Sequence, residues 1–368
     1  MSPNGRFVAF DSHATDLVAS DTNGAPDVFL YDRTYDTLTI ASVDSSGNQA
    51  NAGSYAGSVS DDGDVAFASW ADNLVSGDAS LDTSDVFVND FNGGTERIDL
   101  EVSDIYNEWM GNIDPKISAD GDLVVYAAWV ADPEPFQGAL ELMVHDRTTD
   151  TSQVVVDDSD GVGYYDLSAD GSTIAFETYS QLLSADTDTM SDIYVQDVST
   201  SSRQLASSDS WTGYEGISPA ISGTGRFVAF QWNDCLPTSY GCSAEAFEVR
   251  VWDDNSNSTS RVSKDPNGNQ PVGYFGKPAI SRDGRYVTFA SDVETLDPND
   301  SNERTDVFVR DRDNDETDIV SMSGSTQADE ESGFSAIAND GTVAFDSYAS
   351  NLAAGDTEGT QDVFLIED

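Results

Sequence analysis

The sequence predicts an all-β fold: a seven-bladed β-propeller of four-stranded antiparallel blades, with an incomplete seam between the first and last blades. A Ser-x-Asp-Gly-like turn recurs seven times, and its glycines are 50 to 59 residues apart. Short runs rich in β-branched and aromatic residues surround each turn, and none has the 3.6-residue period of a helix. We therefore interpret the chain as a single domain of repeats, with blades at about 1–43, 44–100, 101–156, 157–206, 207–263, 264–321 and 322–368.

Each turn leads directly into a predicted strand. The copies of the turn begin at Ser2, Ser60, Ser118, Ser168, Ser222, Ser281 and Ala338. The strand that follows ends in Phe in six units, as in Arg6-Phe-Val-Ala-Phe10. We expect these rings to lie between neighbouring blades, at Phe10, Phe67, Phe176, Phe230, Phe289 and Phe345.

Three further strands complete the unit. One begins with an acidic residue, as in Asp27-Val-Phe-Leu-Tyr31. A weaker strand follows it, as in Thr37-Leu-Thr-Ile40, and a small strand precedes the next turn, as in Pro278-Ala-Ile280. Four short strands in each unit, without helical periodicity between them, are typical of a propeller blade.

The unit Ser-x-Asp-Gly-x-x-(Val/Ile)-Ala-Phe, followed by Asp-Val-Phe-Val-x-Asp, resembles the PD40 (WD40-like) repeat of TolB-like β-propellers. The resemblance covers essentially the whole chain and implies the propeller fold. The family includes periplasmic scaffold proteins and propellers attached to peptidases, so the repeat specifies the fold well and the function poorly. We expect neither the helical N-terminal domain of TolB nor a peptidase domain in these residues.

The family's strand order places the turn between the innermost strand and the second. The chain begins at the turn and ends at Asp362–Asp368, so the first blade should lack its innermost strand and the last blade its outermost. Trimming from a larger surface protein would explain both losses. Alternatively, a partner segment completes the sheet at the open seam by strand addition.

The charge excludes two classes of partner. The chain has 68 Asp and Glu against 16 Lys and Arg, a net charge of −52, which repels nucleic acids and anionic lipids. No apolar run is long enough to span a bilayer, so we expect no membrane insertion. Lysine occurs only at Lys116, Lys264 and Lys277. A surface rich in carboxylates and poor in lysine favours a marine or halophilic source over an ordinary acidic secreted protein.

Cys235 and Cys242 are separated by six residues that include Pro and Gly. We favour a disulfide in a hairpin loop over two free thiols, and a disulfide indicates an oxidising compartment. The first residues are no signal peptide, so an export signal has been removed or never existed. We expect an extracellular or periplasmic location.

Four loops share the pattern Asp-x-(Asn/Asp/Glu)-x-x-x-Asp, which could supply three oxygen ligands to calcium. The alternative is that these side chains cap turns by bonding their own backbone. The candidate ligands are Asp21, Asn23, Asp27, Asp186, Asp188, Asp192, Asp300, Asn302, Asp306, Asp356, Glu358 and Asp362.

Aromatic residues recur just before the innermost strand, and others stand where the repeats diverge. Such rings could stack on a sugar or bind a peptide, or they could cap the packing between blades. The candidate ligand-binding residues are Tyr55, Trp109, Tyr164, Trp211, Tyr214 and Tyr274.

No catalytic residue can be assigned from the sequence. Glu108 and Asp114 are conceivable carboxylates, the two histidines are scattered, and there is no nucleophile elbow. We expect a secreted or cell-surface, non-catalytic module that binds protein or glycan, with loops braced by calcium. The alternative is a carbohydrate-active enzyme, a hydrolase or lyase, with carboxylates in an axial pocket.

Overall fold

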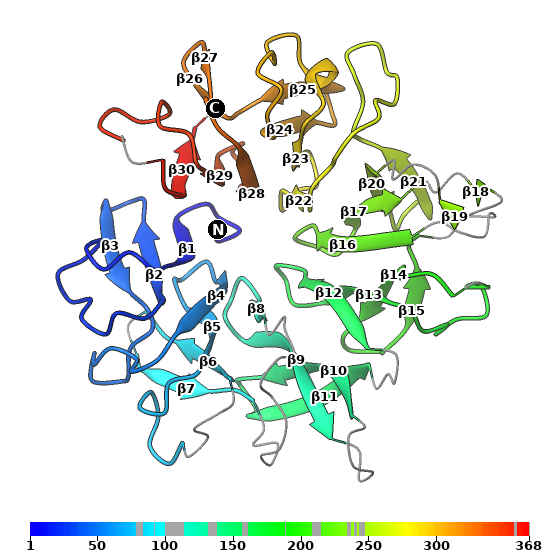
Figure 1. Ribbon diagram of the computed structural model, residues 1–368. Coiled ribbons are helices and arrows are strands. Elements are labelled where there is room, and N and C mark those ends of the chain that lie inside the picture. The colour runs from blue at the N-terminus through cyan, green and yellow to red at the C-terminus, as the bar shows by residue number, and fades with distance from the viewer. Residues whose placement is uncertain are drawn as a thin grey trace. The chain divides into compact units, whose positions relative to one another are not determined.

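The computed structural model is an all-β propeller of seven blades, which confirms the predicted fold class (Figure 1). It describes residues 1–78, 84–91, 93–99, 114–131, 138–156, 161–187, 189–207, 215–233, 237–238, 241–242, 247–356 and 359–367. The blades belong to two compact units. The first is Met1–Val162 with Ala169–Gly171, and the second is Gly163–Ser168 with Ser172–Asp368.

The first unit contains three sheets, and the strands of each are antiparallel and pair in chain order. Blade 1 consists of β1 (Phe7–Ser12), β2 (Asp27–Asp32) and β3 (Thr37–Ile40). Blade 2 consists of β4 (Ser54–Val59), β5 (Val65–Ser69), β6 (Asp85–Asn89) and β7 (Thr95–Arg97). Blade 3 consists of β8 (Lys116–Ile117), β9 (Leu123–Ala131), β10 (Gly138–Asp146) and β11 (Thr151–Val156).

The second unit contains the other four sheets. Blade 4 consists of β12 (Val162–Leu167), β13 (Thr173–Thr178), β14 (Asp192–Asp197) and β15 (Arg203–Leu205). Blade 5 consists of β16 (Glu215–Ile221), β17 (Phe227–Asn233), β20 (Phe247–Asp253) and β21 (Ser258–Arg261). Blade 6 consists of β22 (Ala279–Ile280), β23 (Tyr286–Ser291), β24 (Asp306–Asp311) and β25 (Glu316–Ile319), and blade 7 of β28 (Ser332–Ile337), β29 (Val343–Ser347) and β30 (Asp362–Ile366).

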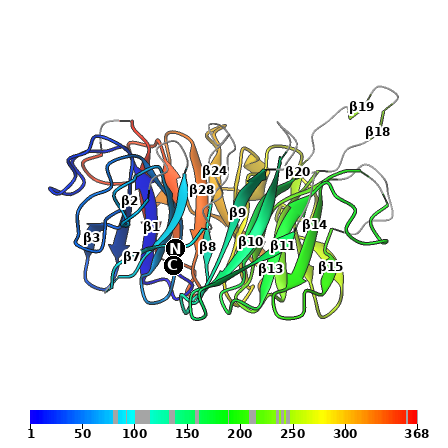
Figure 2. The same cartoon turned by 90° about the horizontal axis from the view of Figure 1, so that it is seen from below.

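Short elements decorate the second unit. The pair β18 (Pro237–Thr238) and β19 (Gly241–Cys242) projects beyond the sheet of blade 5 (Figure 2). A 3-10 turn, η1 (Glu294–Leu296), follows β23, and the pair β26 (Met322–Ser323) and β27 (Thr326–Gln327) precedes blade 7.

The first and last blades each have three strands, as predicted. In blade 1 the chain enters at β1, which corresponds to the second strand of the complete blades. In blade 7 the chain ends after β30, which corresponds to the third strand. Blade 1 therefore lacks an innermost strand and blade 7 an outermost strand.

The recurring turn is explained by its backbone geometry. Its glycines are left-handed in all seven copies, with φ between 71° and 96° at Gly5, Gly63, Gly121, Gly171, Gly225, Gly284 and Gly341. A side chain at this φ would be strained, which favours glycine. The serine hydroxyl accepts a hydrogen bond from the backbone five residues later, at 3.0 Å from Leu123 N to Ser118 Oγ. The turn thus sets the start of the strand that follows.

The recurrent Phe of the second strand stacks on a ring of the third strand in every blade that has this Phe except blade 5, where Phe230 faces Arg250. Phe67 faces Phe87 in register with ring centroids 5.7 Å apart, and Phe289 faces Phe308 at 6.2 Å. Phe67 packs with Val28 of blade 1. In the second unit, Phe230 packs against blade 4, Phe289 against blade 5 and Phe345 against blade 6. The core therefore lies between successive blades; Phe10, in the incomplete blade, is partly exposed.

Candidate functional site

Exposed aromatic side chains gather at the end of the blades where the innermost strand begins and the second strand ends. Among the described residues nine aromatic side chains are exposed, and seven of them lie at two places in the blades. The first place, at or just before the start of the innermost strand, holds Tyr55, Tyr164, Tyr274 and Phe334, and the second, directly after the second strand, holds Trp70, Tyr179 and Tyr348. The two places adjoin, because the rings of Tyr55 and Trp70 meet edge to face with centroids 5.2 Å apart.

Three of the six predicted ligand-binding residues belong to this group. Tyr55, Tyr164 and Tyr274 are 36%, 40% and 50% exposed, so solvent reaches each ring. The other three, Trp109, Trp211 and Tyr214, lie outside the described residues. Ligand binding by these rings stays a prediction.

In the second unit a partly buried carboxylate lies beneath Tyr164. Glu177, at the end of β13, accepts a hydrogen bond of 2.5 Å from the backbone N–H of Ser218. Ser218 reaches it because β16 shifts register there and Ser218 is left-handed, with φ 55°. A Cβ on Gly163 would collide with the Glu177 carboxylate, so the glycine leaves room for the carboxylate in this position. Burial raises the pKa of Glu177, although backbone hydrogen bonds and the charge of Lys277 oppose that rise.

Lys277 joins this group from the segment that precedes β22. Its Nζ lies 4.8 Å from the centroid of the Tyr164 ring, a cation–π contact. The inner strands β12, β16 and β22 follow one another in this unit (Figure 1). Blades 4, 5 and 6 thus each contribute a group to one small cluster, namely Tyr164 and Glu177, Ser218, and Lys277.

Two other exposed rings of the second unit also have a carboxylate behind them. Asp292 Oδ1 accepts a hydrogen bond of 2.8 Å from the backbone N–H of Tyr274. Asp346 lies against Gly333, next to Phe334, and burial raises the pKa of Asp346. The recurring combination of a solvent-facing ring and a carboxylate offers both a stacking surface and hydrogen-bond acceptors.

Sequence reasoning missed Glu177, Asp346 and Lys277, although two of the three had a signal. Glu177 and Asp346 directly follow the recurrent Phe, where blades 2 and 6 have Ala68 and Ala290. A polar side chain at a position that is Ala in three blades is the signal to search for, and Asp11 and Gln231 carry it in blades 1 and 5. The position of Lys277 against Tyr164 depends on the packing of blade 6 and has no such signal.

The acidic loops of blades 1 and 6 share one arrangement, in which a glutamine bridges two aspartates. Gln49 Nε2 donates to Asp21 Oδ1 at 2.9 Å and to Asp27 Oδ2 at 2.6 Å. Ser42 Oγ donates to the other oxygen of Asp27 at 2.6 Å. Asn23 holds the loop through a hydrogen bond of 2.8 Å to the Ala50 carbonyl.

Blade 6 repeats this arrangement atom for atom. Gln327 Nε2 donates to Asp300 Oδ1 at 2.7 Å and to Asp306 Oδ2 at 2.8 Å, and Asn302 bonds the Ala328 carbonyl at 2.9 Å. Burial raises the pKa of Asp306 to about 6, although hydrogen bonds from Ser321 and Gln327 oppose that rise. Asp21 Oδ2 and Asp300 Oδ2 are both buried, and neither has a hydrogen-bond partner in the part of the chain that the structure describes.

The other two loops depart from this arrangement. In blade 4, Tyr194 Oη donates to Asp186 at 2.6 Å and Ser207 Oγ donates to Asp192 at 2.5 Å. In blade 7, Asp356 is partly exposed and Asp362 is exposed. Asp188 and Glu358 lie outside the described residues. The four loops are therefore not equivalent, and only blades 1 and 6 share the glutamine bridge among the loops as described.

Within the described ranges, no three His, Cys, Asp or Glu side chains cluster closely enough to hold a metal ion. The calcium prediction is therefore unconfirmed. Glu108 and Cys235 lie outside the described residues, and Cys242 is placed only as part of β19, so the disulfide stays a prediction. Asp114 forms an ion pair of 2.5 Å with Lys116.

Comparison with known proteins places the chain by its fold. No protein-family model and no curated protein matches the sequence. An oligogalacturonate lyase in complex with manganese has a TM-score of 0.59 at 14% identity, over 100% of this chain and 87% of the lyase. The β-propeller domain of the Trilobed protease from Pyrococcus furiosus has a TM-score of 0.52 at 13% identity, over 83% of this chain and 78% of that domain.

TolB from Acinetobacter baumannii is also similar, with a TM-score of 0.49 at 14% identity over 86% of this chain. This chain spans 63% of that TolB structure. The predicted resemblance to TolB-like propellers is confirmed at the level of the fold. Propellers of this kind occur in a lyase and in a protease, and the fold alone leaves both binding and catalysis open.

Proposed function

We propose that this chain is a non-catalytic binding module that holds a saccharide on the aromatic set of its second unit, defined as Tyr164, Tyr179, Tyr274, Phe334 and Tyr348. The supporting observation is that these five rings are 40% to 77% exposed and all lie at one end of their blades. Apolar side chains that serve packing alone would be buried. Recurring exposed rings of this kind indicate an interaction surface.

The chemistry of the aromatic set suits a sugar. The apolar face of a pyranose stacks on Tyr or Phe, and the hydroxyl groups at its edge need nearby acceptors. Glu177, Asp292 and Asp346 supply carboxylates next to three of the rings. We infer that this surface selects neutral or cationic sugars, because carboxylates repel acidic ones.

Affinity electrophoresis tests this proposal. The protein is run through native gels that contain xylan, soluble cellulose, chitosan or pectin, and a ligand retards it. We expect Tyr164→Ala and Tyr274→Ala each to weaken binding more than about fivefold, as for residues that anchor an interface. Tyr35→Ala is the matched control, because Tyr35 is 70% exposed but lies in the loop between β2 and β3. If none of the four polysaccharides retards the protein, the result contradicts saccharide binding and redirects the search to protein ligands.

Glu177 favours a second candidate function, a carbohydrate-active enzyme. A carboxyl group whose pKa is raised by burial retains its proton longer and can act as a general acid. In that case Glu177→Gln abolishes release of reducing or unsaturated ends from a bound polysaccharide but leaves binding intact. If the wild type binds and releases no product, the binding module stands.

Bound calcium in the loops of blades 1 and 6 is a further part of the proposal. It is supported by the unpartnered, buried oxygens of Asp21 and Asp300, which occupy equivalent places and accept no hydrogen bond from the described residues. We expect calcium, at matched ionic strength, to raise the melting temperature saturably, and excess chelator to reverse the rise. Asp21→Asn combined with Asp300→Asn should remove the effect, whereas Asp356→Asn should not. An unchanged melting temperature would assign these aspartates to turn formation.

We also propose that the protein works outside the cytoplasm. No helix in the described part of the chain is long and apolar enough to cross a membrane. The spacing of Cys235 and Cys242 supports a disulfide and therefore an oxidising compartment. Reaction of both thiols with a thiol reagent in the native, unreduced protein would argue against this location.

A further inference from the structure

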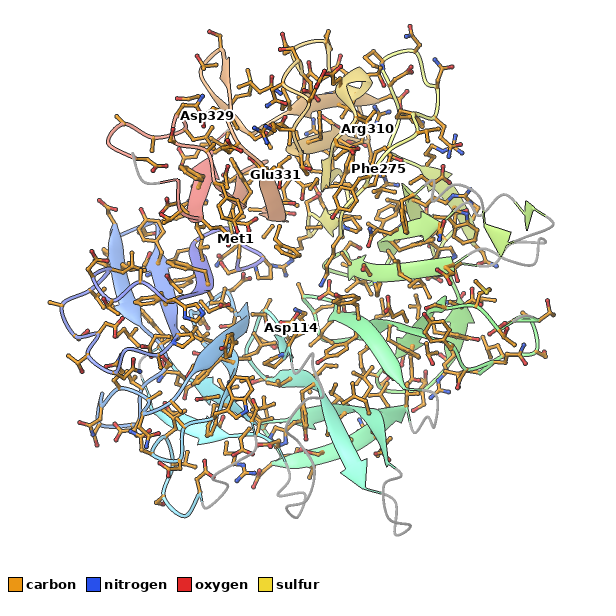
Figure 3. All side chains as sticks on the ribbon, viewed as in Figure 1. Met1, Asp114, Phe275, Arg310, Asp329 and Glu331 are labelled. Carbon is orange, nitrogen blue, oxygen red and sulfur yellow. The ribbon has the colours of Figure 1, made fainter. Side chains whose placement is uncertain are left out.

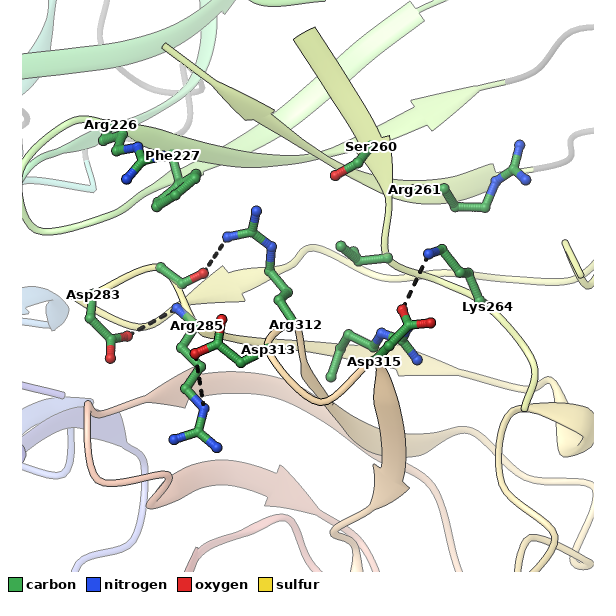
Figure 4. A pocket seen from close by; sticks show the side chains of 13 residues that line it. Arg226, Phe227, Ser260, Arg261, Lys264, Asp283, Arg285, Arg312, Asp313 and Asp315 are labelled. Carbon is green, nitrogen blue, oxygen red and sulfur yellow. Dashed lines mark hydrogen bonds and ion pairs between the residues drawn. The ribbon is translucent and has the colours of Figure 1, made fainter. Parts of the chain in front are cut away.

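A cavity of about 360 Å³ lies between blades 5 and 6, at the end of the blades where the Ser-x-Asp-Gly turns stand (Figure 4). Six cationic and three acidic side chains line it, so the lining is net positive. The six include more than a third of the 16 Lys and Arg of a chain whose net charge is −52. The cationic residues are Arg226, Arg261, Lys264, Arg285, Arg310 and Arg312.

Arg312 extends into this cavity from the turn after β24 (Figure 4). Its Nη1 donates to the Gly284 carbonyl, and its guanidinium carbon lies 4.4 Å from the centroid of the Phe227 ring. No carboxylate of the described residues forms an ion pair with Arg312. Burial lowers the pKa of Arg312, which remains charged because an arginine pKa is so high.

In blade 3 the equivalent arginine, Arg147, has its charge neutralised by side chains of the protein itself. Arg147 donates to the Gly121 carbonyl at 2.6 Å, as Arg312 does to Gly284. Arg147 also pairs with three acids of blade 2: Asp64 at 3.2 Å, Asp90 at 2.8 Å and Glu96 at 2.5 Å. Burial opposes ionisation there too, but the hydrogen bonds to Asp90 and Glu96 raise the pKa of Arg147.

Two of these three acids are replaced in blade 5. The strand registers align Glu96 with Ser260, because Val88 pairs with Glu96 and Val251 pairs with Ser260. Phe227 takes the place of Asp64. A Cβ on Gly121 would meet Asp64, and a Cβ on Gly284 would meet Phe227.

The third acid is present but pairs with another arginine. The same registers align Asp90 with Asp253, which forms an ion pair of 3.0 Å with Arg226. The charge of Asp253 still acts on Arg312 and opposes the fall of its pKa. Arg312 therefore keeps its place in the fold but has lost two of the three carboxylates that neutralise Arg147, and it forms no ion pair with the third.

The neighbouring cations do not restore the balance. Glu248 pairs with both Arg250 and Arg261. Asp315 pairs with both Lys264, at 3.3 Å, and Arg310. Each of these two carboxylates is shared by two cations, which leaves positive charge there in addition to that of Arg312, whereas Arg226 and Arg285 are paired with Asp253 and Asp311. Of the other acids in the lining, Asp283 accepts from the backbone N–H of Arg285 at 2.9 Å, and Asp313 lies 3.8 Å from the Arg285 side chain.

We infer that the cavity between blades 5 and 6 binds a small oxyanion, a sulfate, phosphate or carboxylate group, which takes the place of the missing carboxylates beside Arg312. Guanidinium groups present planar pairs of N–H donors that match such oxyanions, and hydrogen bonds between two charged groups are the strong ones. The site is separate from the aromatic set, which lies at the opposite end of the blades. It can hold a free anion or the anionic substituent of a larger molecule.

Thermal unfolding tests this inference, with sodium sulfate, phosphate or galacturonate titrated at an ionic strength held constant with chloride. We expect at least one of these anions to raise the melting temperature saturably. A response to galacturonate at lower concentration than to the inorganic ions would identify an acidic sugar as the source of the group. The reverse order would identify sulfate or phosphate.

Two variants separate binding in the cavity from the general stabilisation that sulfate and phosphate give to proteins. Arg312→Gln should weaken the response about tenfold or more, as expected for loss of a charged hydrogen bond. Ser260→Glu restores the acid that blade 2 has at Glu96, so it should keep the fold and abolish the response. Arg33→Gln is the control, because Arg33 makes the same hydrogen bond, of 2.6 Å, to the Gly5 carbonyl in blade 1.

The inference is overturned if none of the three anions raises the melting temperature more than chloride does at the same ionic strength. It is equally overturned if Ser260→Glu and Arg312→Gln both respond as the wild type does. If Arg312→Gln fails to fold, the Ser260→Glu variant alone decides.

Discussion

Gln49 donates a hydrogen bond of 2.6 Å to Asp27, a carboxylate 22 residues earlier in the chain. The same amide nitrogen also bonds Asp21, so one side chain ties together both ends of an acidic loop. The arrangement recurs at Gln327 in blade 6. Two buried carboxyl groups thus share one uncharged donor in each loop.

Gln49→Ala should destabilise the protein by about 1–3 kcal/mol, because it leaves buried carboxylate oxygens without a donor. Urea unfolding measures the loss. Gln204→Ala is the matched control, because the hydrogen bond from Gln204 to Asp254 is exposed and its loss should cost little. Equal midpoints for the two variants would show that the Gln49 bridge carries no stability.

Asp306 should make stability fall as the pH rises from about 4 to about 6. Its pKa is raised from 3.8 to about 6, chiefly by burial, so the folded protein holds this proton more tightly than the unfolded chain in that window. Below this pH window Asp306 is protonated in both the folded and the unfolded state, and its full contribution to the free energy of unfolding is present. Above the window that contribution is lost.

The measurement is the urea midpoint at both ends of that pH window, for the wild type and Asp306→Asn at one ionic strength. The difference between the two proteins isolates this residue from the many other carboxylates. A pH dependence that is the same in the variant contradicts the assignment.

Phe289→Ala should cost about 3–5 kcal/mol, because Phe289 is fully buried between blades 5 and 6. Phe275 (labelled in Figure 3) is also fully buried. The centroid of its ring lies 5.8 Å from that of Phe289. Phe10→Ala is the internal comparison at the same position of the repeat, and it should cost less because Phe10 is partly exposed. Thermal unfolding of the two variants ranks them, and the reverse order would contradict the position of the core.

Salt should stabilise the protein. The net charge is −52, and self-repulsion among carboxylates falls as the Debye length shortens from ~10 Å at about 0.1 M to ~3 Å at about 1 M. The melting temperature in sodium chloride should therefore rise steeply over this range. A flat or falling curve would count against a marine or halophilic source.

Much of the fold could be predicted because its signals are local. The turn needs a left-handed glycine, as at Gly121, and a serine that bonds the backbone five residues on. The exposed rings of Tyr164 and Tyr274 were also predictable as candidates, since they recur just before the innermost strand. Their exposure was not predictable, because it depends on how far each ring stands from the neighbouring blade.

The partners of the charged groups lie far away in the sequence, and this separates what the sequence by itself determined from what the tertiary structure decided. The repeat and its short strands follow from short-range backbone preferences that each unit satisfies alone, and the resemblance to TolB-like propellers supplied the strand order and therefore the incomplete first and last blades. The roles of the polar residues do not. Arg147 meets Asp64 across 83 residues, whereas the equivalent Arg312 meets Phe227 instead. Whether a charge is neutralised within the protein or left for a ligand depends on which side chain the adjacent blade places beside it, and only the packed structure brings the two together.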